Sequence, residues 1–178
     1  MTIITSGDVG AARRTVPSSW VSSHIRVFLV DDVGAFRALM RFTLEEDPRI
    51  QVVGEAADGC EGVNGVEELK PDVVLLDLAM PVLDGFEAMP LILERSPGTT
   101  IVALSGFTAE RMAGPCIESG AHSYLEKGED AAVIREAVLQ AGIAASLRIA
   151  PSALSTSDAA IARSSSSVRS WIGCGARA

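Results

Sequence analysis

The stretch PDVVLLDLAMPVLDG, residues 71–85, decides the fold. An apolar run at 73–76 ends on Asp77 and is followed by Pro81 and by the pair Asp84-Gly85. This order predicts a short buried strand, a turn and the start of a helix. Short, almost wholly apolar strands are typical of parallel sheets that helices cover on both faces. Asp77 is therefore expected at the carboxyl end of a parallel strand.

The alternation of short apolar runs and longer helical segments extends on both sides of this stretch and predicts an α/β, doubly wound parallel sheet. Five strands are expected at Ile25–Val30, Gln51–Glu55, Val73–Leu76, Ile101–Leu104 and Ser123–Leu125. Five helices are expected at 34–46, 59–69, 84–95, 108–119 and 130–146. Asp84 and Thr108 are expected N-caps. Pro90 and Pro115 fall inside the third and fourth helices and should kink or shorten them.

Composition divides the chain into a flexible N-terminal arm at 1–24, one domain at 25–148, and a Ser/Ala/Arg-rich tail at 149–178 that we expect to be disordered. No apolar run approaches the roughly 20 residues of a membrane-spanning helix. The segment around Arg13-Arg14 lacks the apolar stretch of an export signal. These features favour a cytoplasmic protein without membrane association.

Charge and cysteine usage exclude two further classes of protein. A formal net charge of -8 disfavours direct nucleic-acid binding, which relies on clustered Lys and Arg. Three cysteines, Cys60, Cys116 and Cys174, stand in no spacing typical of zinc ligands. Their odd, scattered count also favours a reducing cytoplasm.

Three carboxylates follow two of the expected strands: Asp31 and Asp32 after 25–30, and Asp77 after 73–76. Residues just past the carboxyl ends of parallel strands converge on one crevice. Any one such aspartate would more commonly cap a helix or face water. Three together repel one another unless a cation binds, and Mg²⁺ prefers hard oxygen ligands shared with phosphate. A Mg²⁺ site is therefore predicted.

The residues Val30-Asp31-Asp32 and the stretch 71–85 resemble the signature of bacterial response-regulator receiver domains, and the resemblance spans roughly residues 25–146. It implies a flavodoxin-like (CheY-like) sheet with strand order 2-1-3-4-5. It further implies that Asp77 is the phosphoacceptor, Asp32 a direct Mg²⁺ ligand, Asp31 a ligand through water, and Ala79 a ligand through its backbone carbonyl. A carboxylate beside a cation can form an acyl phosphate, so the chemistry agrees.

Three further positions complete the resemblance. Ser105, beside Gly106, could donate to a phosphoryl oxygen, although a Ser-Gly pair alone is more often a turn. Lys127 could pair with Asp77 as a compact charge, although a lone lysine is more often solvated. Tyr124 resembles the aromatic residue that reorients on phosphorylation, and ordinary half-buried packing stays open for it.

The segments 120–127 and 148–151 resemble the NarL/LuxR branch of response regulators, whose members usually continue into a helix-turn-helix domain. Residues after Pro151 are few and serine-rich, so we expect a stand-alone response regulator. A sensor histidine kinase or phosphotransfer protein would donate the phosphoryl group, and the altered surface would act on a downstream protein target. Enzymatic activity would be limited to phosphoryl transfer to itself and autodephosphorylation. A homodimer stays open.

Three other functions also stay open. The chain could be a truncated NarL/LuxR-type transcription regulator, or an interaction module that needs no phosphate, although the intact acidic set argues against the module. It could also be a Mg²⁺-dependent phosphohydrolase that forms an aspartyl phosphate. Such an enzyme needs a cap or long loops around its substrate, whereas the connections after the first, third and fourth strands are short.

Overall fold

The computed structural model describes residues 24–149. Apart from His24 and Ile149, the predicted arm (1–24) and tail (149–178) lie outside these described residues. The elements are β1 (Ile25–Val30), α1 (Gly34–Glu45), β2 (Ile50–Ala56), α2 (Gly59–Leu69), β3 (Val73–Asp77), α3 (Gly85–Arg95), β4 (Thr100–Ser105), α4 (Ala109–Glu118), β5 (Ser123–Glu126) and α5 (Ala131–Ile149). Within 24–149, no helix is both long and apolar enough to span a membrane.

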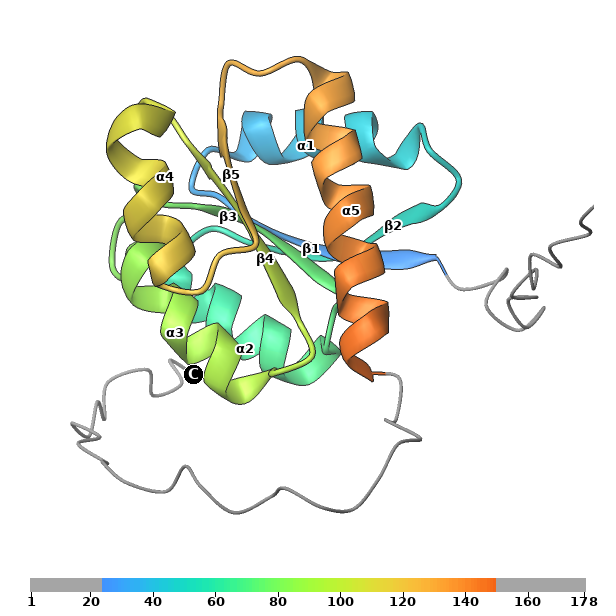
Figure 1. The fold of residues 1–178 in the computed structure, drawn as a ribbon, viewed down its shortest axis with the longest axis horizontal. Helices are drawn as coiled ribbons and strands as arrows, with labels where there is room; N and C mark the ends of the chain where they lie inside the picture. Colours follow the sequence, from blue (N-terminus) through green and yellow to red (C-terminus); the bar gives the residue numbers. More distant parts are fainter. Residues whose placement is uncertain (1–23, 150–178) are drawn as a thin grey trace, which may run out of the picture.

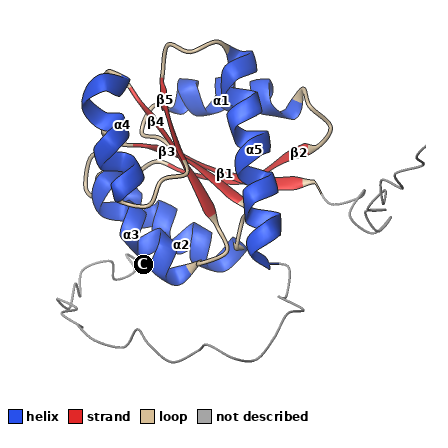
Figure 2. Ribbon diagram, in the orientation of Figure 1, coloured by secondary structure: helices blue, strands red, loops and turns tan. Residues whose placement is uncertain are grey.

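The five strands form one parallel sheet in the order β2-β1-β3-β4-β5, so the predicted fold class and strand order are confirmed. Helices α1 and α5 cover one face, and α2, α3 and α4 cover the other (Figures 1 and 2). All strands begin and end within one residue of their predicted bounds. The apolar runs therefore locate the strands well, because parallel strands are buried along their whole length.

The central strands send alternate side chains into two separate cores. Phe28 and Val30 of β1 join the core beneath α2, α3 and α4, whereas Val27 and Leu29 join the core beneath α1 and α5. The same alternation holds for β3 and β4. Because both faces are packed, the sheet holds the carboxyl ends of β1 and β3 in a defined position.

Helices α3 and α4 continue through Pro90 and Pro115, and both begin and end within one residue of their predicted bounds, so the alternative that they would be shortened is wrong. Each proline removes one helical hydrogen bond. In α3, buried Met89 and Ile92 on either side of Pro90 hold the helix by packing. In α4 only Cys116 is buried, which leaves this helix thinly anchored.

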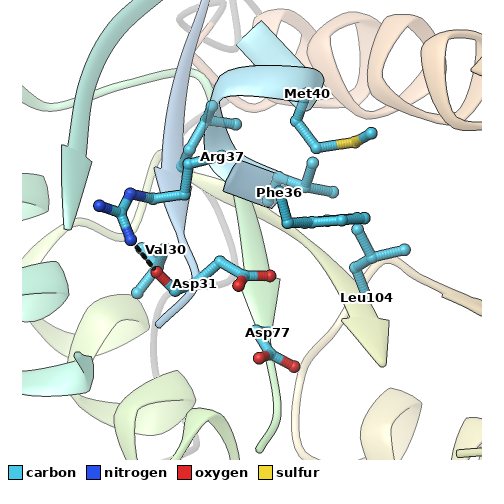
Figure 3. A pocket seen from close by; sticks show the side chains of 9 residues that line it. Val30, Asp31, Phe36, Arg37, Met40, Asp77 and Leu104 are labelled. Carbon is cyan, nitrogen blue, oxygen red and sulfur yellow. Dashed lines mark hydrogen bonds between the residues drawn. The ribbon is translucent and has the colours of Figure 1, made fainter. Parts of the chain in front are cut away.

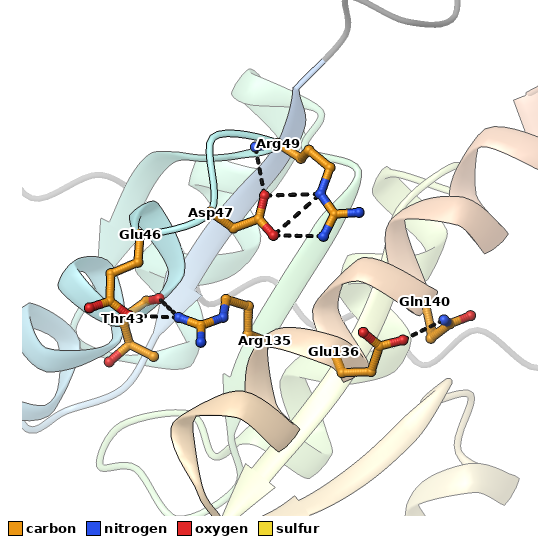
Figure 4. Close-up of polar contacts among 7 residues, drawn as sticks. All are labelled: Thr43, Glu46, Asp47, Arg49, Arg135, Glu136 and Gln140. Carbon is orange, nitrogen blue, oxygen red and sulfur yellow. Dashed lines mark hydrogen bonds and ion pairs between the residues drawn. The ribbon is translucent and has the colours of Figure 1, made fainter.

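Polar contacts join α1 to α5 on the other face (Figure 4). Arg135 Nη1 of α5 donates to the carbonyl oxygen of Thr43 at 3.0 Å and pairs with Glu46 at 2.7 Å. After α1, the guanidinium of Arg49 pairs with Asp47 at 2.7 Å and lowers the pKa of Asp47 to about 2. These contacts join the end of α1 to α5 and hold the turn that leads into β2.

Candidate functional site

The carboxyl ends of three strands deliver the predicted charged residues to one crevice. Asp31 and Asp32 follow β1, Asp77 is the last residue of β3, and Lys127 follows β5. The three aspartates each place a carboxylate oxygen within 4.8 Å of the others. Asp31 and Asp77 are buried, whereas Asp32 is exposed. The convergence expected from the sequence therefore occurs.

Lys127 bridges the two buried carboxylates. Its Nζ lies 2.7 Å from Oδ2 of Asp31 and 2.9 Å from Oδ2 of Asp77. Burial lowers the pKa of Lys127, but its bonds to Asp31 and Asp77 outweigh burial, and the pKa is raised. Burial raises the pKa of Asp77 despite the bonds from Lys127 and from the amide of Ala79. One ammonium faces three carboxylates, so the crevice has excess negative charge and suits a cation.

Backbone contacts fix the orientation of both buried aspartates. Asp31 Oδ1 accepts from the amide of Val33 at 2.9 Å, and Asp77 Oδ1 accepts from the amide of Ala79 at 3.2 Å. Arg37 of α1 donates to the Asp31 carbonyl at 2.5 Å (Figure 3). The two amide bonds hold the carboxylate groups in place, and the Arg37 bond holds the backbone of Asp31.

A small cavity of about 10 Å³ borders two of the acids, Asp31 and Asp77. Apolar side chains form much of its wall (Figure 3), and its lining residues are Leu29, Val30, Asp31, Phe36, Arg37, Met40, Leu75, Asp77 and Leu104. A cavity of this size holds about one water molecule. This cavity is therefore too small to enclose an organic substrate.

Close backbone contacts position the loop between β3 and α3, which carries Ala79. A Cβ on Gly85 would lie 2.0 Å from the carbonyl oxygen of Asp77, so only glycine permits this approach. Asp84 caps α3 by accepting from the amide of Glu87 at 2.8 Å, as predicted. Ala79 itself is exposed, and the metal-binding role of its carbonyl stays a prediction.

Ser105 is the last residue of β4, and Tyr124 lies in the neighbouring strand β5. Ser105 is fully buried; its Oγ accepts from the amide of Phe107 at 3.3 Å and its carbonyl oxygen from the amide of Lys127 at 2.8 Å. The half-buried Tyr124 donates from its hydroxyl to the Phe107 carbonyl at 2.7 Å, and burial raises its pKa. The switching roles of both residues stay predictions.

The sequence interpretation missed three contacts. The Phe36 ring lies beneath the Lys127 ammonium, 4.9 Å from Nζ to the ring centroid. Arg37 holds the backbone of Asp31, as described above. Glu126 Oε1 accepts from the amide of Ala109 at 2.8 Å and caps α4, whereas the predicted N-cap, Thr108, forms no side-chain capping bond. The only sequence signal for these contacts is that the residues lie near predicted site residues in the chain. Phe36 lies one helical turn after Asp32, and Glu126 precedes Lys127.

Comparison with known proteins places this geometry in a family. The family model for the response regulator receiver domain matches residues 27–139. The transcriptional regulatory protein LiaR of Bacillus subtilis is 44% identical over 114 residues, which are 64% of this chain and 54% of LiaR. A protein-glutamate methylesterase/protein-glutamine glutaminase of Methanosarcina mazei is 40% identical over 112 residues, 62% of this chain and 30% of that protein. The chain thus spans about half, or less, of these two relatives.

Solved structures agree with the sequence comparisons. The response regulator domain of Thermotoga maritima CheB aligns with a TM-score of 0.62 and 34% identity, covering 67% of this chain and 97% of that one. The signal receiver domain of NarL from Mycobacterium tuberculosis aligns with a TM-score of 0.64 and 29% identity, covering 68% of this chain and 98% of that one. The chain described here belongs to the family of response regulator receiver domains.

Proposed function

We propose that the domain acts in a two-component phosphorelay by accepting a phosphoryl group on Asp77 in a reaction that depends on Mg²⁺. The observation that supports this most directly is the placement of Asp77. Its buried carboxylate lies at the carboxyl end of β3, among two further carboxylates and one ammonium. A structural ion pair would need only one acid for Lys127, whereas a phosphoryl-transfer site needs acids for a cation as well.

The proposed step is a direct transfer. A carboxylate oxygen of Asp77 bonds to phosphorus while the bond from phosphorus to the donor's leaving group breaks, so the domain gains one acyl phosphate. The Lys127 ammonium, already within 2.9 Å of Oδ2, is placed to pair with a phosphoryl oxygen. Ser105, at the end of the neighbouring strand β4, is the proposed hydroxyl donor on the opposite rim. Apart from the nucleophile, the protein supplies little covalent chemistry. The rate of transfer would therefore depend mainly on how the site positions the donor and neutralises its charge.

The donor set fits the proposed cation. Asp32 and Asp77 would bind Mg²⁺ directly, Asp31 through water, and Ala79 through its backbone carbonyl. All are hard oxygen donors, and the carboxylates exceed the positive charge of Lys127. A bound Mg²⁺ would neutralise negative charge on the phosphoryl oxygens. The exposed Asp32 lies at the open side of the cluster, where a hydrated ion can enter.

The proposed partners follow from this chemistry. A cytoplasmic sensor histidine kinase or phosphotransfer protein would donate the phosphoryl group. A downstream protein would bind the surface formed by β5 and the segment 106–109, because Tyr124 and Glu126 both hold that segment. The short connections from β1 to α1, from β3 to α3 and from β4 to α4 disfavour the alternative of a phosphohydrolase for small phosphoesters, which must enclose its substrate.

Intact mass spectrometry tests the proposal. The protein is incubated with Mg²⁺ and acetyl phosphate, alongside Asp77→Asn, a chelator sample and the exposed-site control Asp130→Asn. We expect one phosphoryl adduct on the wild type and on Asp130→Asn, and none on Asp77→Asn or with chelator. An adduct that persists in Asp77→Asn, or no adduct on the wild type while Mg²⁺ binds, contradicts the proposal. Steady turnover of a chromogenic phosphoester would instead support the hydrolase.

A further inference from the structure

An aromatic ring lies directly against the ammonium group at the centre of the site. Phe36 belongs to the first turn of α1, and its ring centroid is 4.9 Å from Lys127 Nζ. The ring packs from a half-buried position against the core beneath α1 and α5. It also lines the same crevice as Asp31 and Asp77 (Figure 3). The packing fixes the ring, so it offers the ammonium a rigid surface.

The Lys127 side chain needs such a surface because its stem is long and rotatable. It follows the short edge strand β5, and its side chain is 23% exposed. Its backbone is held by one bond, from its amide to the Ser105 carbonyl. Its ammonium must stay between Asp31 and Asp77 to serve the reaction, although solvent and the exposed Asp32 also attract it. Two carboxylates fix Nζ on one side, and Phe36 is in contact with it on another.

We propose that Phe36 is a positioning residue for phosphoryl transfer: its ring face holds the Lys127 ammonium between Asp31 and Asp77 through a cation–π interaction. This inference rests on the proposed function and adds a residue to it. The negative face of the ring attracts a cation, and the attraction is strongest where water is partly excluded, as it is around the Lys127 side chain, which is only 23% exposed. The ring touches no reacting atom, so Phe36 acts only through Lys127.

The competing explanation is that Phe36 only fills space beneath α1. The two explanations differ in what they require of the ring. Packing depends on its volume and shape, whereas a cation–π interaction depends on the electron density of its face. Replacing ring hydrogens with fluorine withdraws that density with little change in volume, so a fluorinated series separates the two.

The experiment introduces mono-, di- and trifluorinated phenylalanine at position 36 of the full chain and measures the rate of adduct formation from acetyl phosphate and Mg²⁺. The rate should fall with each added fluorine, by roughly 3- to 10-fold across the series, as expected for a cation–π contact of moderate strength. Phe36→Leu should show a similar loss, and Phe36→Tyr should retain most of the rate. The same series at Phe42, an exposed ring on the same helix, should leave the rate unchanged.

Three outcomes are distinguishable. A graded loss at Phe36 with a flat series at Phe42 supports the inference. A flat series at Phe36, in a protein whose wild type forms the adduct, overturns it and leaves packing as the role of the ring. If the wild type forms no adduct, the proposed function itself fails, and the positioning role fails with it. Thermal unfolding of each variant checks that a slower rate does not reflect a damaged fold.

Discussion

Lys127 Nζ lies 2.9 Å from Asp77 Oδ2, although Lys127 and Asp77 are 50 positions apart in the sequence. The same ammonium also pairs with Asp31, and Asp32 adds a third carboxylate to the cluster. The site thus holds more negative than positive charge in a partly buried place. Burial raises the pKa of Asp77, so its ionised carboxylate opposes folding.

Asp77 should make the protein less stable as pH rises. Burial raises the pKa of Asp77 in the folded protein, so between its ordinary pKa and this raised value the folded state binds more protons than the unfolded state. The free energy of unfolding therefore falls as pH rises through that interval. Asp77→Asn removes this penalty. In chelator, urea unfolding should show Asp77→Asn more stable than wild type at neutral pH, with the difference shrinking below the ordinary aspartate range.

A difference between Asp77→Asn and wild type that does not change with pH would contradict this assignment. Asp47→Asn is a useful comparison because the pKa of Asp47 is lowered, to about 2, by Arg49. The pH dependence of stability that arises from Asp47 therefore has the opposite sign. Its contribution to the free energy of unfolding is present above the ordinary aspartate pKa and is lost as pH falls toward 2.

Mg²⁺ should stabilise the folded domain. A ligand that binds only the folded state at about 100 times its dissociation constant adds about 2.7 kcal/mol to the free energy of unfolding. Thermal unfolding with and without Mg²⁺ measures this effect. Asp32→Ala should lose most of it, whereas Asp130→Ala, an exposed acid outside the cluster, should keep it. Equal stabilisation of all three proteins would place the ion elsewhere.

Gly85 should tolerate no side chain. Ala at this position would put its Cβ 2.0 Å from the Asp77 carbonyl oxygen and 2.8 Å from Leu78 Cα, so the start of α3 must move away from β3. We expect Gly85→Ala to cost at least about 3 kcal/mol in chemical unfolding and to reduce the adduct yield. Gly106→Ala is the matched control, because its Cβ would meet nothing within 4 Å. Gly106→Ala should change stability by less than about 0.5 kcal/mol.

Glu126 should hold the start of α4. Its carboxylate caps Ala109, the helix buries only Cys116, and Thr108 supplies no side-chain cap. Glu126→Ala should therefore weaken α4 locally by about 1 kcal/mol, seen as roughly 5-fold faster amide hydrogen exchange in its first turns. Glu129→Ala, in the exposed loop that follows, serves as the control. Unchanged exchange in Glu126→Ala would show that another contact anchors α4.

The fold could be predicted because its strands are buried on both faces and appear as plain apolar runs. The acid cluster then followed from topology, since parallel strand ends meet along one edge of a sheet. The prolines were harder: the expected shortening ignored the packing of Met89 and Ile92, which holds α3 on both sides of Pro90. Helix propensity accounts for the hydrogen bond that a proline removes, but it does not account for the apolar area that the helix buries.

The contacts made by helices were not predictable in the same way. Phe36 reaches Lys127 only because α1 leaves the sheet at a particular angle, and Glu126 reaches Ala109 only because its side chain turns toward α4. Both depend on side-chain rotamers and on the placement of elements far apart in sequence. Neither residue type, taken at its position, distinguishes such a contact from ordinary packing or from a solvated charge.

The measurement that tests the central claim most directly is the location of the phosphoryl group. The wild-type adduct is reduced with borohydride, which converts an acyl phosphate on aspartate into homoserine. All peptides of the digest, including those that carry positions 31, 32 and 77, are then sequenced by tandem mass spectrometry. Homoserine at position 77 is the predicted result. Homoserine at position 31 or 32, or a phosphoryl group on a hydroxyl or imidazole elsewhere, would contradict the assignment of Asp77 as the acceptor.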